Sequence, residues 1–207
     1  MGNILVVKSS AGGAASVSNR LIDELVARLK AERPDLTVVE RDLDRQPVPY
    51  VTSDTLAGIG RAAPETEATK PTRALSDALI AELHAADMIV IGSPMYNFGI
   101  AAPLKSWFDH VLRAGATFQY GSNGPEGLVR PKPVVVVETR AGIYATGPYA
   151  PFDAQEPHLR AMLGFIGLKD VAFVRAEGLA LGEAERVVAA AAERLAAIGT
   201  PALREAA

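Results

Sequence analysis

The fold of this chain is decided by the apolar stretch Met88-Ile89-Val90-Ile91, which leads into Ser93-Pro94-Met95-Tyr96-Asn97-Phe98. A short, continuous apolar run is typical of a strand that is buried on both faces of a parallel sheet. Pro103 follows, where a proline is well placed to begin a helix. A strand, an irregular polar and aromatic loop and a helix in succession are the usual build of a ligand site in an open α/β sheet.

The rest of the chain repeats this alternation. The apolar runs predict five strands, at Ile4–Val7, Leu36–Val39, Met88–Ile91, Val134–Val137 and Val171–Val174. Apolar residues at helical spacing predict helices around Leu21–Leu29, Leu75–Leu83, Leu104–Leu112, Leu159–Ile166 and Val187–Leu195. Right-handed crossovers then give an α/β fold, a doubly wound five-stranded parallel sheet with helices on both faces. We expect residues 1–207 to form a single domain.

Composition narrows the function. Of the 207 residues, 49% are hydrophobic and 22% are charged, which is an ordinary globular balance. A formal net charge of −3 without a basic cluster argues against a nucleic-acid partner. The 0 cysteines exclude disulfides, thiolate metal sites and a cysteine nucleophile. No secretory signal and no apolar run near the ~20 residues of a membrane span are visible, and we therefore expect a cytoplasmic protein with no membrane association.

The loop after the first strand is small and rich in hydroxyl groups. It contains Ser9, Ser10, Gly12-Gly13 and the run Ser16-Val17-Ser18 at the expected start of a helix. The unpaired amides and the dipole of a helix start favour an anion, which would suit a phosphate. The alternative is an ordinary helix cap made by Ser16 or Ser18. The loop alone leaves these two interpretations equally open.

Several common motifs are absent or lack their context. The chain has no Gly-Lys-Ser/Thr P-loop and no Gly-x-Ser-x-Gly nucleophile elbow. The glycine pattern Gly58–Ala63 follows polar residues rather than a strand, and we expect it to be a helix end or loop. The three histidines lack metal-ligand spacing, which predicts no metal site, and His110 is expected on a helix surface.

A third loop, Thr139–Gly142, is expected to leave its strand at the same sheet edge as the other two. It again combines a hydroxyl with glycine and exposed backbone. Three such loops at one edge would suit a ligand with a phosphate tail and a heteroaromatic head. The competing interpretation of the central loop is plain packing, with Asn97 as a helix cap and Phe98 in the core.

Five motifs, spread in order over most of the chain, resemble one family. They are Lys8-Ser9-Ser10, Ser16-Val17-Ser18-Asn19, Pro94-Met95-Tyr96-Asn97-Phe98, Asn123-Gly124-Pro125-Glu126-Gly127-Leu128 and Leu163-Gly164-Phe165-Ile166-Gly167. The chain is similar in these motifs to the FMN-dependent NADH:quinone oxidoreductase/azoreductase family of flavodoxin-like fold. Two departures concern substrate choice. Ala141 stands where the family often has glycine, and Tyr144 stands where some members carry histidine.

The resemblance implies a bound FMN, with NADH as electron donor and quinones or azo compounds as acceptors in a ping-pong reaction. It implies a homodimer in which the partner completes each site. It assigns the cofactor to Ser10, Ser16, Val17, Ser18, Met95, Tyr96, Asn97, Phe98, Thr139, Arg140, Ala141 and Gly142. The substrate would lie against Phe98, Tyr120, Tyr144 and Phe165.

The resemblance names no certain catalytic side chain, because the flavin carries the chemistry, although Asn97 is expected near the flavin N5 edge. The competing function is a non-enzymatic electron carrier of the flavodoxin type. A net charge of −3 is mild for a carrier that docks a protein partner, and the insertion 115–131 would suit the wall of a substrate site.

Overall fold

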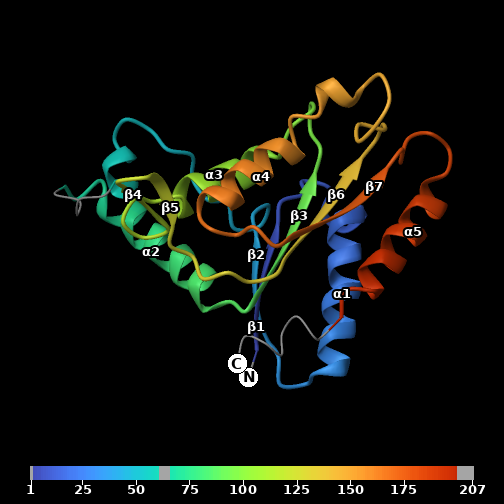
Figure 1. Ribbon diagram of the computed structural model, residues 1–207, viewed down its shortest axis with the longest axis horizontal. Helices are drawn as coiled ribbons and strands as arrows, with labels where there is room; N and C mark the ends of the chain where they lie inside the picture. Colours follow the sequence, from blue (N-terminus) through green and yellow to red (C-terminus); the bar gives the residue numbers. More distant parts are fainter. Residues whose placement is uncertain (1, 61–65, 200–207) are drawn as a thin grey trace.

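The computed structural model describes residues 2–60 and 66–199 and shows a central sheet of five parallel strands (Figure 1). Their order in the sheet is β2-β1-β3-β6-β7. The strands are β1 (Asn3–Lys8), β2 (Thr37–Asp42), β3 (Met88–Pro94), β6 (Val134–Arg140) and β7 (Val171–Glu177). This confirms the doubly wound α/β fold that the sequence predicts.

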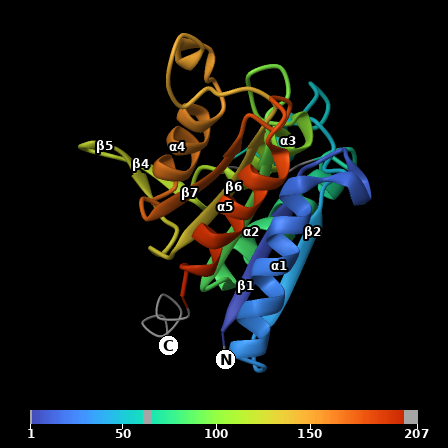
Figure 2. The same cartoon turned by 90° about the vertical axis from the view of Figure 1, so that its right-hand side faces the viewer.

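Helices cover both faces of the sheet. They are α1 (Val17–Glu32), α2 (Lys70–Ala85), α3 (Ala102–Val111), α4 (Glu156–Phe165) and α5 (Ala184–Ala196). Helices α1 and α5 lie side by side on one face, whereas α2, α3 and α4 lie on the other (Figures 1 and 2). The described part of the chain also contains three short 3₁₀ turns, η1 (Gly13–Ala15), η2 (Leu56–Ile59) and η3 (Ala150–Phe152).

Each central strand is buried on both faces, as its continuous apolar run predicts. Along β3, Ile89 and Ile91 pack with α2, α3 and α4, whereas Met88 and Val90 pack with α1 and α5. Burying an aliphatic side chain of this size contributes about 1.5–3 kcal/mol. The two cores therefore hold the sheet rigidly beneath the loops that leave it.

Most strands run further than their apolar runs. β3 continues to Pro94, which pairs with Thr139 of β6, and β6 itself continues to Arg140, which pairs with Glu177 of β7. Polar side chains at these positions stay in the ladder because their partners on the neighbouring strands are extended too. Polar residues therefore form the last paired positions of β6, directly before the chain leaves the sheet.

His110 does not lie on a helix surface, where the sequence predicts it. Helix α3 turns this residue toward the segment before η2; the side chain is 1% exposed and its Nε2 lies 3.0 Å from the Pro49 carbonyl oxygen. Burial lowers the pKa of His110. In the Gly58–Ala63 pattern, Gly58 and Ile59 belong to the turn η2, and residues 61–63 lie outside the described residues.

The insertion 115–131 contains an antiparallel hairpin, β4 (Phe118–Gly121) and β5 (Gly124–Gly127). Figure 2 shows this hairpin projecting from the body of the molecule beside α4. Gly127 is wedged against the end of α4, since a Cβ atom there would lie 2.2 Å from the Gly167 nitrogen. The hairpin is therefore seated by a backbone contact that only glycine permits.

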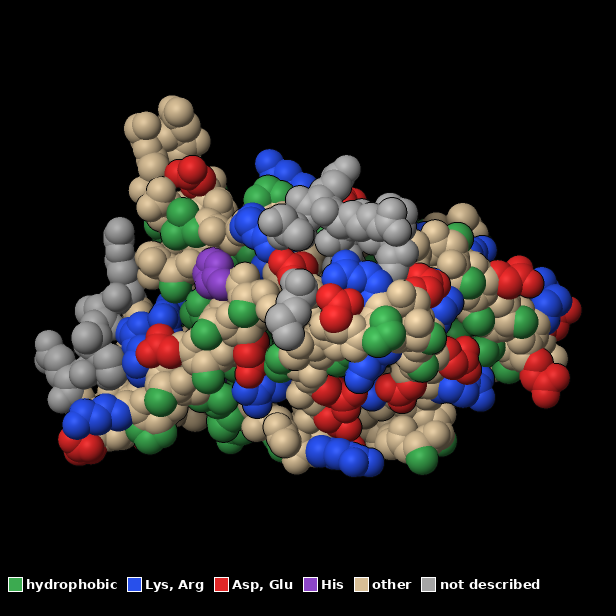
Figure 3. All heavy atoms as spheres, turned by 90° about the horizontal axis from the view of Figure 1, so that it is seen from below, with side chains coloured by type: hydrophobic (Ala, Val, Ile, Leu, Met, Phe, Trp, Pro, Cys, Tyr) green, Lys and Arg blue, Asp and Glu red, His purple; other side chains and the backbone are tan. Residues whose placement is uncertain are grey.

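Strand β1 begins, and α5 ends, at the edge of the sheet opposite to the loops after β1, β3 and β6 (Figure 1). Seen from that side, acidic and basic side chains are interspersed over the described surface (Figure 3). Within residues 2–60 and 66–199, no helix combines the length and the apolar character needed to cross a bilayer.

Candidate active site

The structure brings the three predicted loops together at the carboxyl edge of the sheet. They follow β1, β3 and β6, which are neighbours in the sheet. Direct hydrogen bonds join them: Ser9 Oγ donates to the Gly92 carbonyl at 2.6 Å, and the Met95 amide donates to the Thr139 carbonyl at 2.8 Å. The Ala11 amide donates to the Tyr96 hydroxyl at 3.1 Å. The loops are thus assembled by contacts within the chain itself.

In the first loop, the structure confirms the helix cap. The Ser16 hydroxyl accepts from the Asn19 amide at 3.2 Å and lies 3.1 Å from the Ser18 hydroxyl. The cap leaves the amides of Val17 and Ser18 in the first turn of α1 without carbonyl partners inside the helix. Ser10 is buried nearby. Hydroxyl groups, free amides and the positive end of a helix dipole together form an anion cradle.

The central loop is a tight, strained turn. Tyr96 and Gly99 exchange backbone hydrogen bonds of 3.0 and 3.1 Å, and the two residues between them have positive φ angles, 48° at Asn97 and 74° at Phe98. Left-handed backbone is costly for side chains other than glycine. The packing interpretation was wrong: Phe98 is 48% exposed, and the cap position of α3 is Ala101 rather than Asn97.

The third loop begins inside β6. Thr139 and Arg140 are strand residues, and Arg140 is only 1% exposed, which leaves its backbone rather than its side chain to meet a ligand. Among the described residues, positive φ in a non-glycine residue occurs only at Asn97 and Phe98, so Ala141 occupies its position without backbone strain. At Gly142 a Cβ atom would lie 3.1 Å from the Tyr144 ring, which favours glycine there.

The predicted substrate residues fall into two groups. The Phe98 and Tyr144 rings lie 6.0 Å apart in an edge-to-face arrangement beside the loops. Tyr120 lies on the hairpin, where it contacts Phe118, and Phe118 in turn packs on Phe165 at 4.6 Å. The sequence reasoning missed Phe152, whose ring lies 5.6 Å from that of Phe98. The signal in the sequence was the group of closely spaced aromatic residues Tyr144, Tyr149 and Phe152.

Comparison with known proteins identifies the family. A profile described as flavodoxin-like fold matches residues 2–198. An FMN-dependent NADH:quinone oxidoreductase of Hyphomonas neptunium is 50% identical over 189 residues, which cover 91% of this chain and 90% of that protein. The chain belongs to this oxidoreductase family. A further relative with the same name, from Azotobacter vinelandii, is 47% identical and matches 96% of this chain and 100% of its own length.

A solved structure supports the same placement. The crystal structure of an azoreductase from Bacillus anthracis superposes on this family member with a TM-score of 0.88 and 32% identity. The match covers 96% of this chain and 98% of the other.

The residues of this family member fit a flavin mononucleotide. The cradle at α1 offers hydroxyls and amides, which bind a phosphate dianion without adding formal charge. The central and third loops offer backbone groups and an exposed aromatic edge, which suit a flat polar ring system. No group of three or more His, Cys, Asp or Glu within the described residues has a geometry that could hold a metal ion.

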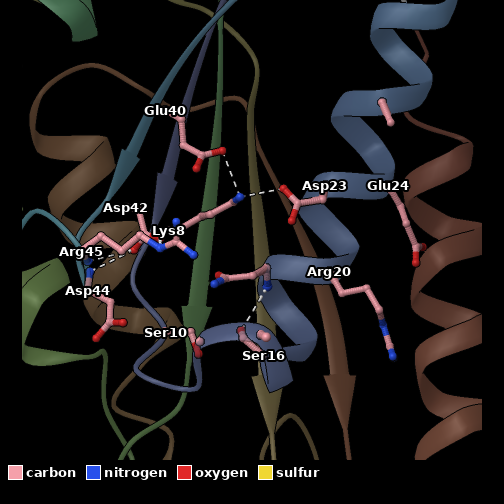
Figure 4. A pocket seen from close by; sticks show the side chains of 14 residues that line it. Lys8, Ser10, Ser16, Arg20, Asp23, Glu24, Glu40, Asp42, Asp44 and Arg45 are labelled. Atoms are coloured by element: carbon pink, nitrogen blue, oxygen red, sulfur yellow. Dashed lines mark hydrogen bonds and ion pairs between the residues drawn. The ribbon is translucent and has the colours of Figure 1, made fainter.

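A cavity of about 590 Å³ lies beside the first loop, between α1 and β2 (Figure 4). Ser10 and Ser16 form one end of it, and Figure 4 shows Lys8 held between Asp23 and Glu40 at its floor. The Lys8 ammonium lies 2.6 Å from Asp23 and 2.9 Å from Glu40. Burial acts to lower the pKa of Lys8, but the bonds to both carboxylates outweigh it and raise that pKa. These ion pairs brace the first loop from outside.

Beneath the third loop lies a buried charge network that the sequence reasoning did not find. Arg140 contacts Glu138, Asp153 and Glu177 at 2.9, 3.0 and 2.9 Å. The Glu177 carboxylate also accepts from the amide of Tyr144 at 2.9 Å. Burial raises the pKa of Glu138 to about 8, because a charge at this fully buried position is poorly solvated. The network fixes the third loop to β7.

Proposed function

We propose that this chain is an FMN-dependent oxidoreductase that transfers two electrons from NADH to quinones and reductively cleaves aromatic azo compounds by a ping-pong mechanism. The observation that carries the proposal is the junction of an anion cradle with two backbone-rich, aromatic-edged loops at one end of the sheet. The names of the relatives at 47% and 50% identity support the donor, the cofactor and the quinone acceptor. The azoreductase structure at 32% identity supports the azo acceptor.

The first loop holds the cofactor phosphate. Ser10, Ser16 and Ser18 supply hydroxyl groups, and the amides of Val17 and Ser18 point out of the first turn of α1. Because these donors are neutral, affinity for the dianion comes from hydrogen bonds and the helix dipole rather than from a basic side chain.

The two other loops hold the ring. Met95–Phe98 flanks its N5 edge, and the backbone at Thr139–Gly142 stabilises negative charge at its N1/O2 edge. An FMN held by these loops would supply the redox chemistry, which is two-electron transfer from NADH to the acceptor. The chain's own residues orient the reactants and exclude water, and solvent supplies the protons. NADH and the acceptor use the same aromatic edge in turn, which is why the kinetics are expected to be ping-pong.

Phe98 and Tyr144 line this edge, and a second copy of the chain contributes Tyr120 and Phe165 to it in a homodimer. The hairpin supports this arrangement, because it projects from the body of the molecule beside α4 (Figure 2) and Tyr120 on it is 68% exposed. Sedimentation equilibrium should give twice the chain mass of 21.8 kDa. A monomer with full quinone reductase activity would contradict the shared site.

The experiment that tests the function is an absorbance spectrum of the purified protein, taken before and after anaerobic NADH and again after one equivalent of a benzoquinone. Flavin bands that bleach with NADH and return with the quinone support the reductase. Bands that NADH does not bleach would favour the alternative, an electron carrier reduced by a protein partner. Absence of flavin after incubation with FMN would contradict both functions.

We also propose that residues 1–207 act as one domain in the cytoplasm. The two cores share a single sheet, which supports one folding unit. A single cooperative unfolding transition and recovery of the native protein in the cytosolic fraction are the expected results.

A further inference from the structure

We propose that Gln155 is a positioning residue that fixes the two ring-binding loops against each other. Its side chain is completely buried. Its amide nitrogen donates to the Ser93 carbonyl at 2.6 Å and to the Ser93 hydroxyl at 3.0 Å. Its amide oxygen accepts from Arg140 Nε at 2.8 Å. One side chain thus joins the end of β3 to the end of β6.

The chemistry of the partners requires this residue type. A carbonyl oxygen at Ser93 must receive a donor, and the guanidinium of Arg140 must meet an acceptor. The side-chain amide of glutamine carries a donor and an acceptor on one planar group of this length. Its orientation is fixed, because the reverse orientation would place the amide NH₂ against the N–H of Arg140. A buried amide with unmet hydrogen bonds would be costly, whereas all three contacts here are made.

The backbone of Gln155 is itself held in place by the side chain of Asp153. The Asp153 carboxylate accepts from the amides of Gln155 and Glu156 at 2.9 and 3.1 Å and pairs through its other oxygen with Arg140 at 3.0 Å. The neighbouring Ala154 amide donates to the Phe98 carbonyl at 3.0 Å. The short segment 153–155 therefore contacts the central loop at both of its ends, Ser93 through Gln155 and Phe98 through Ala154.

This double contact explains why a strained turn persists. Asn97 and Phe98 both have left-handed backbone, which is costly for such residues and survives only where the surroundings fix it. The 153–155 segment supplies that constraint through its hydrogen bonds to Ser93 and Phe98. Gln155 does not line the loop surface; it sets the spacing of the groups that do. This role rests on the proposed placement of the flavin ring between the two loops.

The test uses Gln155→Met, which keeps the length of the side chain and removes its hydrogen bonds. We expect amide hydrogen exchange of the Met95–Gly99 segment in the apoprotein to become about tenfold faster, because the turn loses a buried anchor. The dissociation constant for FMN, measured by flavin fluorescence quenching, should rise by about tenfold for the same reason.

Ser76→Ala is the matched control. Ser76 is equally buried and its hydroxyl donates to the His110 carbonyl at 2.6 Å, but it lies at the α2–α3 contact. This variant should lower the unfolding temperature without changing exchange at Met95–Gly99 or the affinity for FMN. Both variants with the same loop exchange and the same FMN affinity as the parent would overturn the positioning role.

Gln155→Glu provides a second variant if Gln155→Met does not fold. The carboxylate still accepts from Arg140 but cannot donate to Ser93, and faster exchange at Met95–Gly99 is again expected. A variant that folds with unchanged loop exchange would contradict the proposal. Faster exchange with unchanged FMN affinity would support Gln155 as the anchor and contradict the placement of the ring, which separates the two inferences.

Discussion

At the start of α1 the Ser16 hydroxyl caps the helix, and the same group is proposed to bind phosphate. Ser16→Asp separates these roles. Aspartate is an equally good cap and suits the helix dipole, so the unfolding temperature should be maintained. Its negative charge beside the phosphate should weaken FMN binding by more than about tenfold, as measured by fluorescence titration.

Two alanine variants complete this comparison. Ser16→Ala should destabilise the fold by about 1 kcal/mol through loss of the cap. Ser16→Ala combined with Ser18→Ala should release FMN during gel filtration. Full flavin load in the Ser16→Asp protein would contradict the phosphate assignment, whatever its stability.

Asn97 offers a second test at the scale of one residue. Its φ angle is 48°. Glycine reaches this conformation without strain, and asparagine tolerates it better than alanine does. Asn97→Gly should keep the affinity for FMN within about twofold, whereas Asn97→Ala should weaken it by roughly fivefold, since the turn then costs about 1 kcal/mol more. Equal affinities for the two variants would show that the backbone conformation is unimportant for binding.

The structural role of a side chain was predictable from the sequence only where residues nearby in the sequence determine that role. The cap at Ser16 follows from the residues around it, whereas the burial of His110 depends on Pro49, which lies far away in the chain. Gln155 carried no local signal, because its partners Ser93 and Arg140 come from two other strand ends.

At the scale of elements, the β4–β5 hairpin depends on one glycine. A methyl group at Gly127 would meet backbone atoms of Ile166 and Gly167 at 2.3 and 2.2 Å, and backbone cannot move aside cheaply. Gly127→Ala should therefore destabilise the protein by about 1–3 kcal/mol in urea unfolding. Gly121→Ala, in the same hairpin, meets only one atom at 3.7 Å and should change stability little. Equal stability of the two variants would contradict the close contact between Gly127 and the backbone that follows α4.

The five strands were predictable because each contains a run of apolar residues, which burial on both faces requires of β1, β3 and β6. Their full lengths were not, since Glu138, Thr139 and Arg140 extend β6 through partners on β3 and β7. The hairpin escaped prediction as paired strands because its sequence is dominated by polar residues and glycine. Its register follows from the two-residue turn between the paired residues Gly121 and Gly124 rather than from apolar alternation.

Across the whole molecule, one charge network couples β6, β7 and α4. Four carboxyl groups, of Glu138, Asp153, Glu156 and Glu177, meet only three guanidinium groups, of Arg140, Arg160 and Arg175. Burial raises the pKa of Glu138 from 4.5 to about 8. The folded protein therefore keeps a proton that the unfolded chain releases between these values. Stability should fall as pH rises through this window, by up to about 1.4 kcal/mol per pH unit.

Glu138→Gln tests this linkage, because glutamine stays neutral and still accepts from Arg140. Urea unfolding of both proteins at pH 5.5, 6.5 and 7.5 should show a free energy that declines with pH in the parent and is flatter in the variant. Parallel pH profiles would mean that Glu138 is ionised in the folded protein throughout this range.

The chain enters the sheet at the edge opposite to the three loops, and α5 ends near that same edge (Figure 1). A tether attached at the N-terminus would consequently immobilise the molecule with its loop edge pointing away from the support. On an electrode coated in this way, quinones would reach the enzyme from solution without obstruction. Direct electron transfer between the electrode and the loop edge, however, would have to cross the full length of the sheet and should be slow.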